Sequence, residues 1–408
     1  MSFDLALSGI NAANTDLNVT SNNLANVDTT GFKESRAEFA DLFAQTQEGV
    51  SRTAVGNGVQ VAAVAQQFAQ GNITSTGNNL DLALSGSGFF VVSNNGGLNY
   101  TRNGAFQVNQ DGFLVTSSGE QVQGYAALAN GTFNTGGLTS MQLTTAESAP
   151  QATTTAGMSL NLPANATPPA NTPLNPADPT TYTNTTSLTV YDSLGSAHTA
   201  QLYFSKQGAP ANTWTSNLYI DGNAVGAAQT LTFSPTGALS APANGQVNYG
   251  SYTPTTGAAA MSIAFNFGQS TQDGDSFGVD SVTPDGYTTG SLTGISISSS
   301  GIVQANFTNG QSKTLGQVAL ANFANPQGLQ QEGNSEWQQS FDSGAAVHGV
   351  AGGSGFGTIQ SGALESSNVD MTAQLVNMIT AERAFQANAQ MISATDQVTQ
   401  SIINIPNG

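Results

Sequence analysis

Residues 371–392 read MTAQLVNMITAERAFQANAQMI, and their large apolar side chains recur every seven positions. Four of them mark the repeat: Met371, Met378, Phe385 and Ile392. Leu375 lies in the seam between them. A heptad repeat buries a narrow seam against another helix rather than a broad face on a globular core. The pattern therefore predicts a C-terminal helix, from residue 371 to about 403, that needs a helical partner.

The start of the chain carries the same repeat. Its apolar positions are Phe3, Leu7, Ile10, Leu17 and Leu24. They predict a helix from residue 2 to about 27, and Gly31 then supplies the positive φ that commonly ends a helix. Two end helices that need partners indicate a subunit that polymerises. The alternative is a hairpin of the two helices within one chain, which would bury only half of their apolar surface.

Charge and composition exclude several classes of protein. Only 8 % of residues are charged, against about 25 % in an average soluble protein, and 25 acidic residues face seven basic ones, for a net charge of -18. The cations are not clustered, which argues against nucleic-acid and anionic-membrane binding. No apolar run is long enough to span a membrane. Cysteine is absent, so disulfides and thiolate metal sites are excluded. The N-terminus lacks the features of a secretory signal.

The body between the helices has the pattern of β-structure. Apolar runs between residues 80 and 122 alternate with turns such as Asn109-Gln-Asp-Gly112, which predicts a tight meander. Six prolines between Leu162 and Thr180 predict an extended loop. Alternating strands from residue 188 to 267 predict an antiparallel sandwich or barrel. After about residue 285 the first β-pattern returns, with a buried strand at 318–320.

The predicted fold is mainly β with α-helical coiled-coil ends and nested, discontinuous β-domains. Ser367-Asn-Val-Asp370 matches a capping box for the C-terminal helix. The Gly-rich segments at 49–58 and 349–362 are predicted to be loose hinges. We expect four parts: terminal helices at 1–30 and 366–408 forming an inner coiled-coil core, an extended connector at 31–70 and 356–365, an inner β-domain at 71–144 and 286–355, and an inserted outer β-domain at 145–285.

Catalytic chemistry has little support in the sequence. His198 and His348 are 150 residues apart in sequence, and no nucleophile elbow, phosphate loop or zinc-protease motif accompanies them. We therefore predict no catalytic residues, no cofactor and no metal. The acidic segment 273–280 resembles a calcium loop, yet Pro284 stands where a bidentate Glu is required. An acidic surface turn is favoured, and calcium binding stays the alternative.

Several segments resemble one protein family. Residues 21–33, SNNLANVDTTGFK, are similar to the N-terminal signature of bacterial flagellar axial proteins, which comprise the rod, hook and hook-associated subunits. The segments at 80–90, 100–106 and 362–379 resemble the same family. Within it, residues 315–325 and the large insertion after residue 145 favour a hook subunit over the shorter distal-rod subunit. The resemblance covers nearly the whole chain and is weakest in the insertion.

The resemblance implies a structural subunit that assembles into a curved, flexible tube and transmits motor torque to the filament as a universal joint. Its terminal helices would line the inner wall, and its partners would be other copies, the distal rod, the hook cap, the hook–filament junction protein, the length ruler and the type III export gate. The protein would then lie outside the cell, exported without a cleaved signal peptide.

Phe39 and Phe43 resemble the short segment that such subunits present to the export gate. The alternative is that these two side chains only anchor the connector. Two other functions stay open: a distal-rod subunit of the flagellar shaft and a secreted β-rich adhesin. The adhesin would account for the Thr-rich strands but not for the paired heptads.

Overall fold

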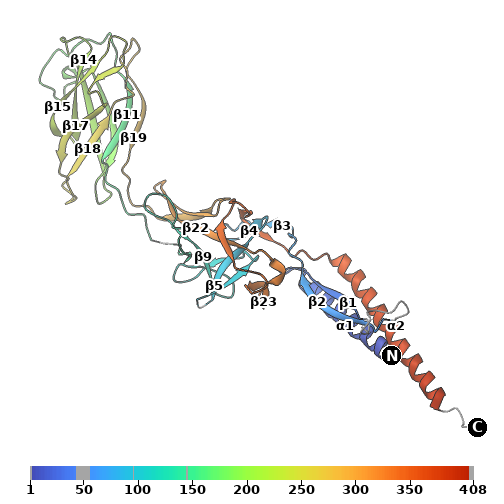
Figure 1. Cartoon of the computed structure of the whole chain (residues 1–408). Coiled ribbons are helices and arrows are strands. Elements are labelled where there is room, and N and C mark those ends of the chain that lie inside the picture. Colours follow the sequence, from blue (N-terminus) through green and yellow to red (C-terminus); the bar gives the residue numbers. More distant parts are fainter. Residues whose placement is uncertain (1, 43–55, 95, 144–145, 404–408) are drawn as a thin grey trace, which may run out of the picture. The chain divides into compact units, whose positions relative to one another are not determined.

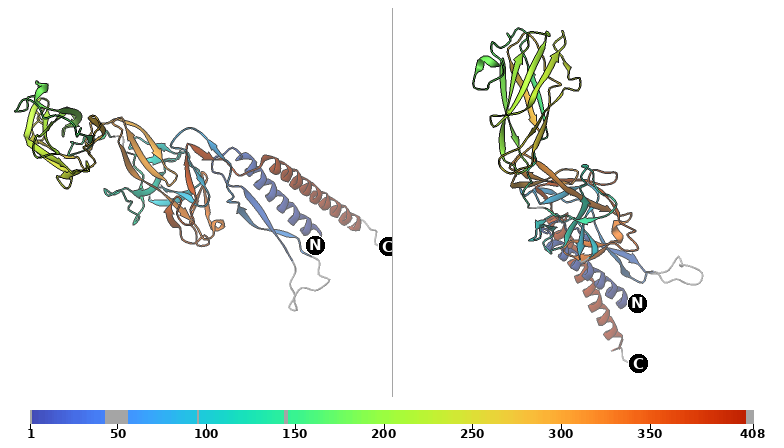
Figure 2. Two further views of the ribbon diagram at one scale, coloured as in Figure 1. Left: turned by 90° about the horizontal axis from the view of Figure 1, so that it is seen from above. Right: turned by 90° about the vertical axis from the view of Figure 1, so that its left-hand side faces the viewer.

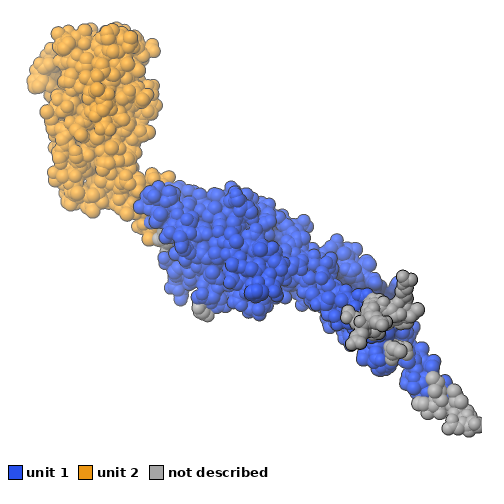
Figure 3. Space-filling model, viewed as in Figure 1, with its two compact units in different colours: residues 1–145, 294–306, 312–408 blue, residues 146–293, 307–311 orange. Residues whose placement is uncertain are grey.

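A computed structural model describes residues 2–42, 56–94, 96–143 and 146–403 (Figure 1). Among the described residues, 43 % are in strands or bridges and 16 % in helices, with one α-helix near each end, which confirms the predicted fold class. The chain forms two compact units, coloured separately in Figure 3. The first comprises residues 1–145, 294–306 and 312–408, and the second residues 146–293 and 307–311. The four-part division predicted from the sequence stays a prediction.

The second unit is a β-sandwich. Alternating apolar side chains of two sheets meet in one core, which includes Trp214, Phe204 and Phe265. One sheet has the order β17 (Gln246–Tyr252), β18 (Met261–Asn266), β11 (Thr155–Asn161), β19 (Gly278–Pro284). The other has the order β12 (Asn184–Tyr191), β13 (Ala197–Lys206), β14 (Thr213–Ile220), β15 (Asn223–Phe233), β16 (Leu239–Ala241). A short 3-10 helix, η1, spans Pro179–Thr181 within the proline-rich loop.

The first unit is built on a 12-stranded sheet. Its main order is β20 (Leu292–Ile297), β21 (Ile302–Phe307), β22 (Ser312–Asn322), β9 (Gln121–Ala126), β5 (Phe89–Asn94), β6 (Gly97–Thr101), β24 (Glu336–Gln338), β23 (Gln330–Gly333). Four short strands join its sides: β7 (Gln107–Val108), β8 (Leu114–Val115), β10 (Thr139–Ser140), β25 (Val347–Val350). Another 3-10 helix, η2, spans Pro326–Gly328. The pairing of β22 with β9 and β5 confirms that the chain returns to the first β-region after the insertion.

Three two-stranded sheets and two helices complete the first unit. The small sheets pair β4 (Leu82–Ser85) with β26 (Thr358–Ser361), β3 (Ile73–Ser75) with β27 (Ala363–Glu365), and β1 (Ser35–Asp41) with β2 (Val59–Gln66). The helices are α1 (Ser2–Ala25) and α2 (Met371–Ile403), at the predicted ends of the chain. They lie side by side in Figure 2, and the β1–β2 hairpin lies against α1.

The segment from 349 to 362 is not the loose hinge predicted from its glycines. Residues 347–350 pair with β22, and residues 358–361 pair with β4. The turn between them is closed by a hydrogen bond from Gly352 N to Gly357 O, 2.9 Å long. Most of the other predicted hinge, 49–58, lies outside the described residues.

Two predicted helix signals act differently from expectation. Gly31 has the predicted positive φ, +69°, but α1 ends six residues earlier. The glycine is needed because a Cβ there would lie 2.5 Å from the backbone nitrogen of Asn103. At α2 the N-cap is Asp370, whose Oδ1 accepts hydrogen bonds from Thr372 N and Ala373 N at 2.8 and 3.1 Å. Ser367 instead accepts from Val369 N.

Candidate assembly surface and the charged joint that carries it

The two terminal helices form an antiparallel pair within one chain. Asn23 near the end of α1 lies 3.4 Å from Gln374 near the start of α2, measured from Nδ2 to Oε1. Gly9 lies against Asn388, because a Cβ on Gly9 would stand 2.6 Å from Asn388 Oδ1. The residue numbers thus fall along one helix as they rise along the other. In Figure 2 the N and C marks accordingly lie at the same end of the pair.

Small and polar residues make up the contact between the helices. On α1, buried Ala6, Ala13 and Thr20 are three or four residues from Gly9 and Asn23, which contact α2, so they share that face. On α2, buried Gln374 and Ala381 stand at seven-residue spacing with Asn388. We call these eight residues the in-chain seam. The side chains of the in-chain seam are small or polar, so most of the apolar burial in the helix pair comes from the half-buried heptad residues beside it.

None of the ten predicted heptad residues is buried in the chain. Ile10, Leu17, Leu24, Met378 and Ile392 are half-buried beside the in-chain seam. The exposed ones are Phe3, Leu7, Met371, Leu375 and Phe385, with 36–50 % of their surface open. Four more apolar residues that do not follow the heptad are also exposed on α2: Val376, Ile379, Met391 and Val398. They lie off the seven-residue repeat, so that repeat alone does not reveal them.

Helix α2 extends past α1. The register that places Gly9 against Asn388 puts the first residues of α1 opposite about residue 394, since each helix rises 1.5 Å per residue. The helix nevertheless runs to Ile403, and Val398 on this extension is 59 % exposed. We call the nine exposed apolar residues of the two helices the exposed apolar set; seven of them lie on α2.

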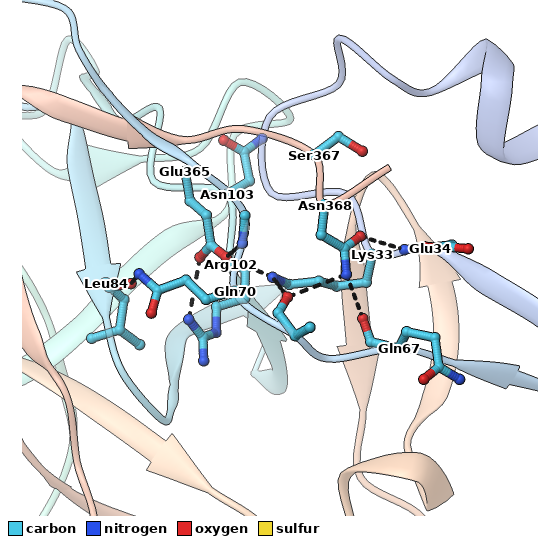
Figure 4. A network of polar contacts seen from close by, with 12 residues as sticks. Lys33, Glu34, Gln67, Gln70, Leu84, Arg102, Asn103, Glu365, Ser367 and Asn368 are labelled. Atoms are coloured by element: carbon cyan, nitrogen blue, oxygen red, sulfur yellow. Dashed lines mark hydrogen bonds and ion pairs between the residues drawn. The ribbon is translucent and has the colours of Figure 1, made fainter. Parts of the chain in front are cut away.

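A buried charged joint ties the helical base to the β-sheet region of the first unit (Figure 4). Lys33 Nζ lies 2.6 Å from Glu365 Oε1, and Arg102 NH1 lies 3.2 Å from Glu365 Oε2. The three side chains are at most 6 % exposed. They come from the loop after α1, the position directly after β6 and the last position of β27. We call Lys33, Arg102 and Glu365 the charged joint.

Each charge of the joint has further polar partners. Lys33 Nζ donates to Ala69 O at 2.8 Å, and Arg102 NH2 donates to Gly86 O at 2.8 Å. Glu365 Oε1 also accepts from Gly71 N at 2.9 Å. Burial lowers the pKa of Lys33 and of Arg102, and the Glu365 carboxylate opposes both shifts. Without Glu365, two buried cations would lack their counter-ion, an arrangement that strongly favours unfolding.

Two asparagine side chains fix the backbone around the joint. Asn368 accepts from Glu34 N at 2.7 Å and donates to Gln67 O at 2.7 Å, so it joins the segment between β27 and α2 to the residues that flank both ends of the hairpin (Figure 4). Asn23 exchanges two hydrogen bonds with the backbone of Ser35, at 2.7 and 2.9 Å. An amide can both donate and accept, which is why Asn suits each position.

An aromatic cluster lies beside the charged joint. Phe68, which follows the β1–β2 hairpin, packs edge-to-face on Phe89 and Trp337, with ring centroids 5.5 and 5.4 Å away. Trp337 Nε1 donates to Gln66 Oε1 at 2.6 Å. Arg102 of the joint lies over the Phe89 ring, 5.4 Å from its centroid. The hairpin is therefore anchored by packing as well as by charge.

The remaining predicted groups show other surroundings. His198 lies between Asp221 and Asp192, with Nδ1–Oδ2 and Nε2–Oδ2 distances of 2.6 and 3.2 Å, inside the second unit. His348 stacks on Tyr100 in the first unit. Among the described residues no three His, Asp or Glu side chains gather as a metal site, those of 273–280 included. Nor does any helix in those ranges have the length and apolarity to cross a membrane.

The predicted export segment is only partly visible. Phe39 stands in β1, 44 % exposed, beside a β-bulge where the hairpin register shifts. Phe43 lies outside the described residues. The role of both in export stays a prediction.

Four family models match the chain in order. They are the flagella basal body rod protein model at residues 3–33, the flagellar hook protein FlgE/F/G D1 domain at 83–168, the flagellar basal body protein FlaE D2 domain at 161–287, and the flagellar basal body rod FlgEFG protein C-terminal model at 360–405. The first covers α1 from Phe3 onward, and the last covers all of α2. Lys33 and Glu365 lie in these two matches, and Arg102 lies in the D1 match.

Full-length relatives agree with these matches. The chain is 38 % identical to the flagellar hook protein FlgE of Salmonella typhimurium, over 99 % of this chain and all of the relative. It is 39 % identical to FlgE of Escherichia coli, with the same coverage. The crystal structure of Helicobacter pylori FlgE2 has a similar fold, with a TM-score of 0.55 at 15 % identity, covering 72 % of this chain and 100 % of that one.

Proposed function

The chain belongs to the flagellar hook protein family and is a structural subunit of the hook, and on that premise we propose that its exposed apolar set is the surface through which copies polymerise. The observation that carries the proposal is that the two helices contact each other and expose apolar surface through different residues. The in-chain seam uses alanine, glycine and polar residues, and large apolar side chains such as Leu375 and Ile379 stay 44 and 51 % exposed. A coiled coil between copies would cover them.

The charged joint is proposed to transmit torque. A universal joint needs a stiff link between its inner wall and the domains outside it. Lys33, Arg102 and Glu365 fasten three segments far apart in sequence, and their ion pairs are shielded from water. Force applied to the helices would therefore reach the sheet region without a compliant linker between them.

The sandwich unit is proposed to provide contacts that slide as the tube bends. Its surface has few charges and many small polar side chains, and such surfaces form wet, low-area contacts that exchange at little cost. Copies must meet through different front and back surfaces, since only heterologous contacts propagate a helix. No role in catalysis is proposed for any residue, and the two histidines are assigned structural roles.

Location and partners complete the proposal. A component of the hook and basal body that polymerises would contact the distal rod below it, and the hook cap and the hook–filament junction protein above it. Export through the flagellar type III gate, with a length ruler present, would bring it outside the cell without a cleaved signal. Phe39 supports a gate-binding segment, because a side chain 44 % exposed on a strand is open to a partner.

Polymerisation of the purified chain tests the assembly proposal. We expect wild-type protein to form curved tubes in electron micrographs, and the double variant Leu375→Ser/Ile379→Ser to stay monomeric with unchanged circular dichroism. Asn377→Ser is the matched control, because this exposed polar residue lies on the opposite side of α2 from Leu375. Straight rods from wild-type protein would favour a rigid shaft. Tubes from the double variant, or from a chain lacking residues 1–25 and 370–408, would refute the proposal.

Complementation tests the export segment in cells. In a flagellated bacterium without its own hook subunit, wild-type chain should restore swimming. Phe39→Ala/Phe43→Ala should remove the protein from the culture medium and leave it in the cytoplasm, as measured by immunoblot. Val61→Ala, on the strand paired with Phe39, is the control for damage to the hairpin. Normal secretion of the double variant would assign these residues to anchoring alone.

A further inference from the structure

A phenylalanine on the turn at residues 340–344 is almost fully exposed. The side chain of Phe341 is 99 % exposed, more than any other large apolar residue among those described. Its backbone is nevertheless held firmly. Ser340 Oγ accepts from Asp342 N and Ser343 N at 3.0 and 3.2 Å, and Ser343 is fully buried. Asn325 Nδ2 donates to Asp342 O at 3.0 Å.

A fixed turn with an exposed aromatic ring has the properties of a binding anchor. The backbone entropy of the turn has already been lost on folding, so a partner need not order it. Aromatic anchors that enter a pocket supply much of the binding energy of protein interfaces. Exposure of such a ring to water is unfavourable until something covers it.

The same unit carries an apolar hollow of about 260 Å³. Its apolar lining comes from Phe323, Ala324, Val347 and Phe356, and the polar part from Asn322, Ser354 and Gly355. No lining residue carries a charge. Val347 at its edge is 60 % exposed. Phe341 of the same chain does not fill the hollow, because its ring has no cover at all.

We infer that Phe341 of one subunit inserts into the hollow formed by Phe323, Val347 and Phe356 of a neighbouring copy. The inference rests on the proposed function, since it requires a polymer that brings copies together. The ring and the hollow are separate but adjacent sites, since Asn325, next to the lining residue Ala324, donates to Asp342 O of the turn. In the helical polymer of the proposed function the contacts are heterologous, so each copy gives a ring to one neighbour and receives one from another.

The size of the contact favours a second copy in a polymer over a free partner. One aromatic side chain buries about 150–250 Å², whereas a stable complex of two proteins buries about 1,200–2,000 Å². The ring alone is therefore too small to hold two free molecules together. In a polymer joined by the terminal helices, the ring and the hollow of neighbouring copies have a high effective concentration. The same small contact then forms and adds to the stability of the polymer. The uncharged lining also suits a chain whose net charge of -18 repels its copies.

Site-directed crosslinking tests the contact, since the chain has no natural cysteine. Phe341→Cys and Ser354→Cys are made as two separate variants, mixed, polymerised and treated with a short bis-maleimide. Because each molecule holds one cysteine, a crosslinked dimer of the two variants reports a contact between copies. We expect this dimer in the polymerised mixture and its absence in dilute monomer. Each variant alone should give less than a tenth of the yield.

Other outcomes overturn the inference. Dimers mainly from Phe341→Cys alone would mean that ring meets ring. Equal dimers in dilute monomer would show that the polymer is not required. No dimer in intact tubes would leave the proposed function standing and refute the inserted ring, whereas failure of wild-type chain to polymerise would refute the proposed function itself.

A truncation measures the strength of the contact. Phe341→Ala should raise the critical concentration for polymerisation about tenfold, the equivalent of one partly buried apolar side chain. Monomer melting should be unchanged. Leu128→Ala is the matched control, since Leu128 is 47 % exposed on another turn of the same unit and does not line the hollow. Equal critical concentrations for Phe341→Ala and wild type would contradict the inference.

Discussion

The helix pair and the charged joint are neighbours in the first unit, but only the joint has its interactions satisfied within one chain. The joint buries Lys33 and Glu365 completely and gives each charge at least two partners. The helix pair places Ala6, Ala13 and Ala381 in its seam and leaves the larger apolar side chains in water. The comparison shows that a single chain completes the charged joint between the helices and the sheet region. The helix pair, in contrast, keeps exposed apolar surface that only other copies can cover.

Physical cost explains why this division works. A half-satisfied buried charge is strongly destabilising, so the joint must be complete before assembly. An exposed apolar side chain on a helix costs less, and it becomes stabilising when another copy covers it. The helices can therefore stay partly exposed until other copies cover them, whereas the charges of the joint must be paired within the single chain.

The largest effect is expected from Glu365→Gln. It removes the shared counter-ion of two buried cations and should lower the free energy of unfolding of the first unit by about 3–5 kcal/mol. The chain has two tryptophans, Trp214 in the second unit and Trp337 in the first. Denaturant unfolding in a Trp214→Phe background, followed by Trp337 fluorescence, therefore reports the first unit alone.

Glu38→Gln is the control for this loss of charge. The Arg36–Glu38 pair lies in β1 with its side chains 64 and 44 % exposed, and exposed pairs contribute about 0–1 kcal/mol. Similar destabilisation by Glu38→Gln and Glu365→Gln would show that the joint is no stronger than a surface ion pair. That result would contradict the proposed difference between the joint and the helix pair.

For the exposed apolar set, a substitution should weaken assembly more than it lowers the stability of the monomer. Leu375→Ala removes apolar surface that is exposed in the chain, so monomer stability should change by less than about 0.5 kcal/mol. In the polymer the same change should weaken assembly by about 1–1.5 kcal/mol per subunit, because assembly can cover only the 44 % of Leu375 that the single chain leaves exposed. Calorimetry of monomer and the critical concentration for polymerisation measure the two quantities. Equal losses in both assays would place Leu375 in the fold of the single chain.

Particular residues show how far the sequence could predict this molecule. The helix bounds and the sandwich follow from periodicity and turns, because those patterns act over neighbouring residues. The ion pairs could not be predicted, since Lys33 and Glu365 are 332 positions apart and only folding brings them together. The resemblance marked the segments that hold Lys33, Arg102 and Glu365 without giving a reason for them. The glycines at 349–362 led to the wrong prediction of a loose hinge, because backbone hydrogen bonds fix the turn there.

The pH dependence should separate the sheet region from the helices. Glu120 is buried, and burial together with Glu336 raises its pKa to about 8, from 4.5 in the unfolded chain. The folded state therefore binds an extra proton between these values, and stability of the first unit falls as pH rises from about 4.5 to about 8. The slope from one proton is at most about 1.4 kcal/mol per pH unit.

Glu120→Gln tests the source of that slope. The amide keeps the shape but cannot ionise, so Trp337-monitored stability should become flatter across the window. Glu332→Gln removes an exposed carboxylate from β23 of the same sheet and should leave the slope unchanged. An unaltered slope in Glu120→Gln would assign the pH dependence to another group. The far-ultraviolet signal of the helices should not follow this titration.

The smallest expected effect lies where the charged joint and the helix pair meet. Asp370 caps α2 through Thr372 N and Ala373 N, and Asp370→Ala should cost about 1 kcal/mol. The loss should appear in hydrogen exchange as faster amides at 372–374, with the amides of β27 unchanged, because Glu365 holds that strand independently. Asp370→Asn retains a capping oxygen and should preserve protection. If Asp370→Ala also speeds exchange in β27, the cap and the joint unfold together, and the boundary between the two regions lies farther into α2.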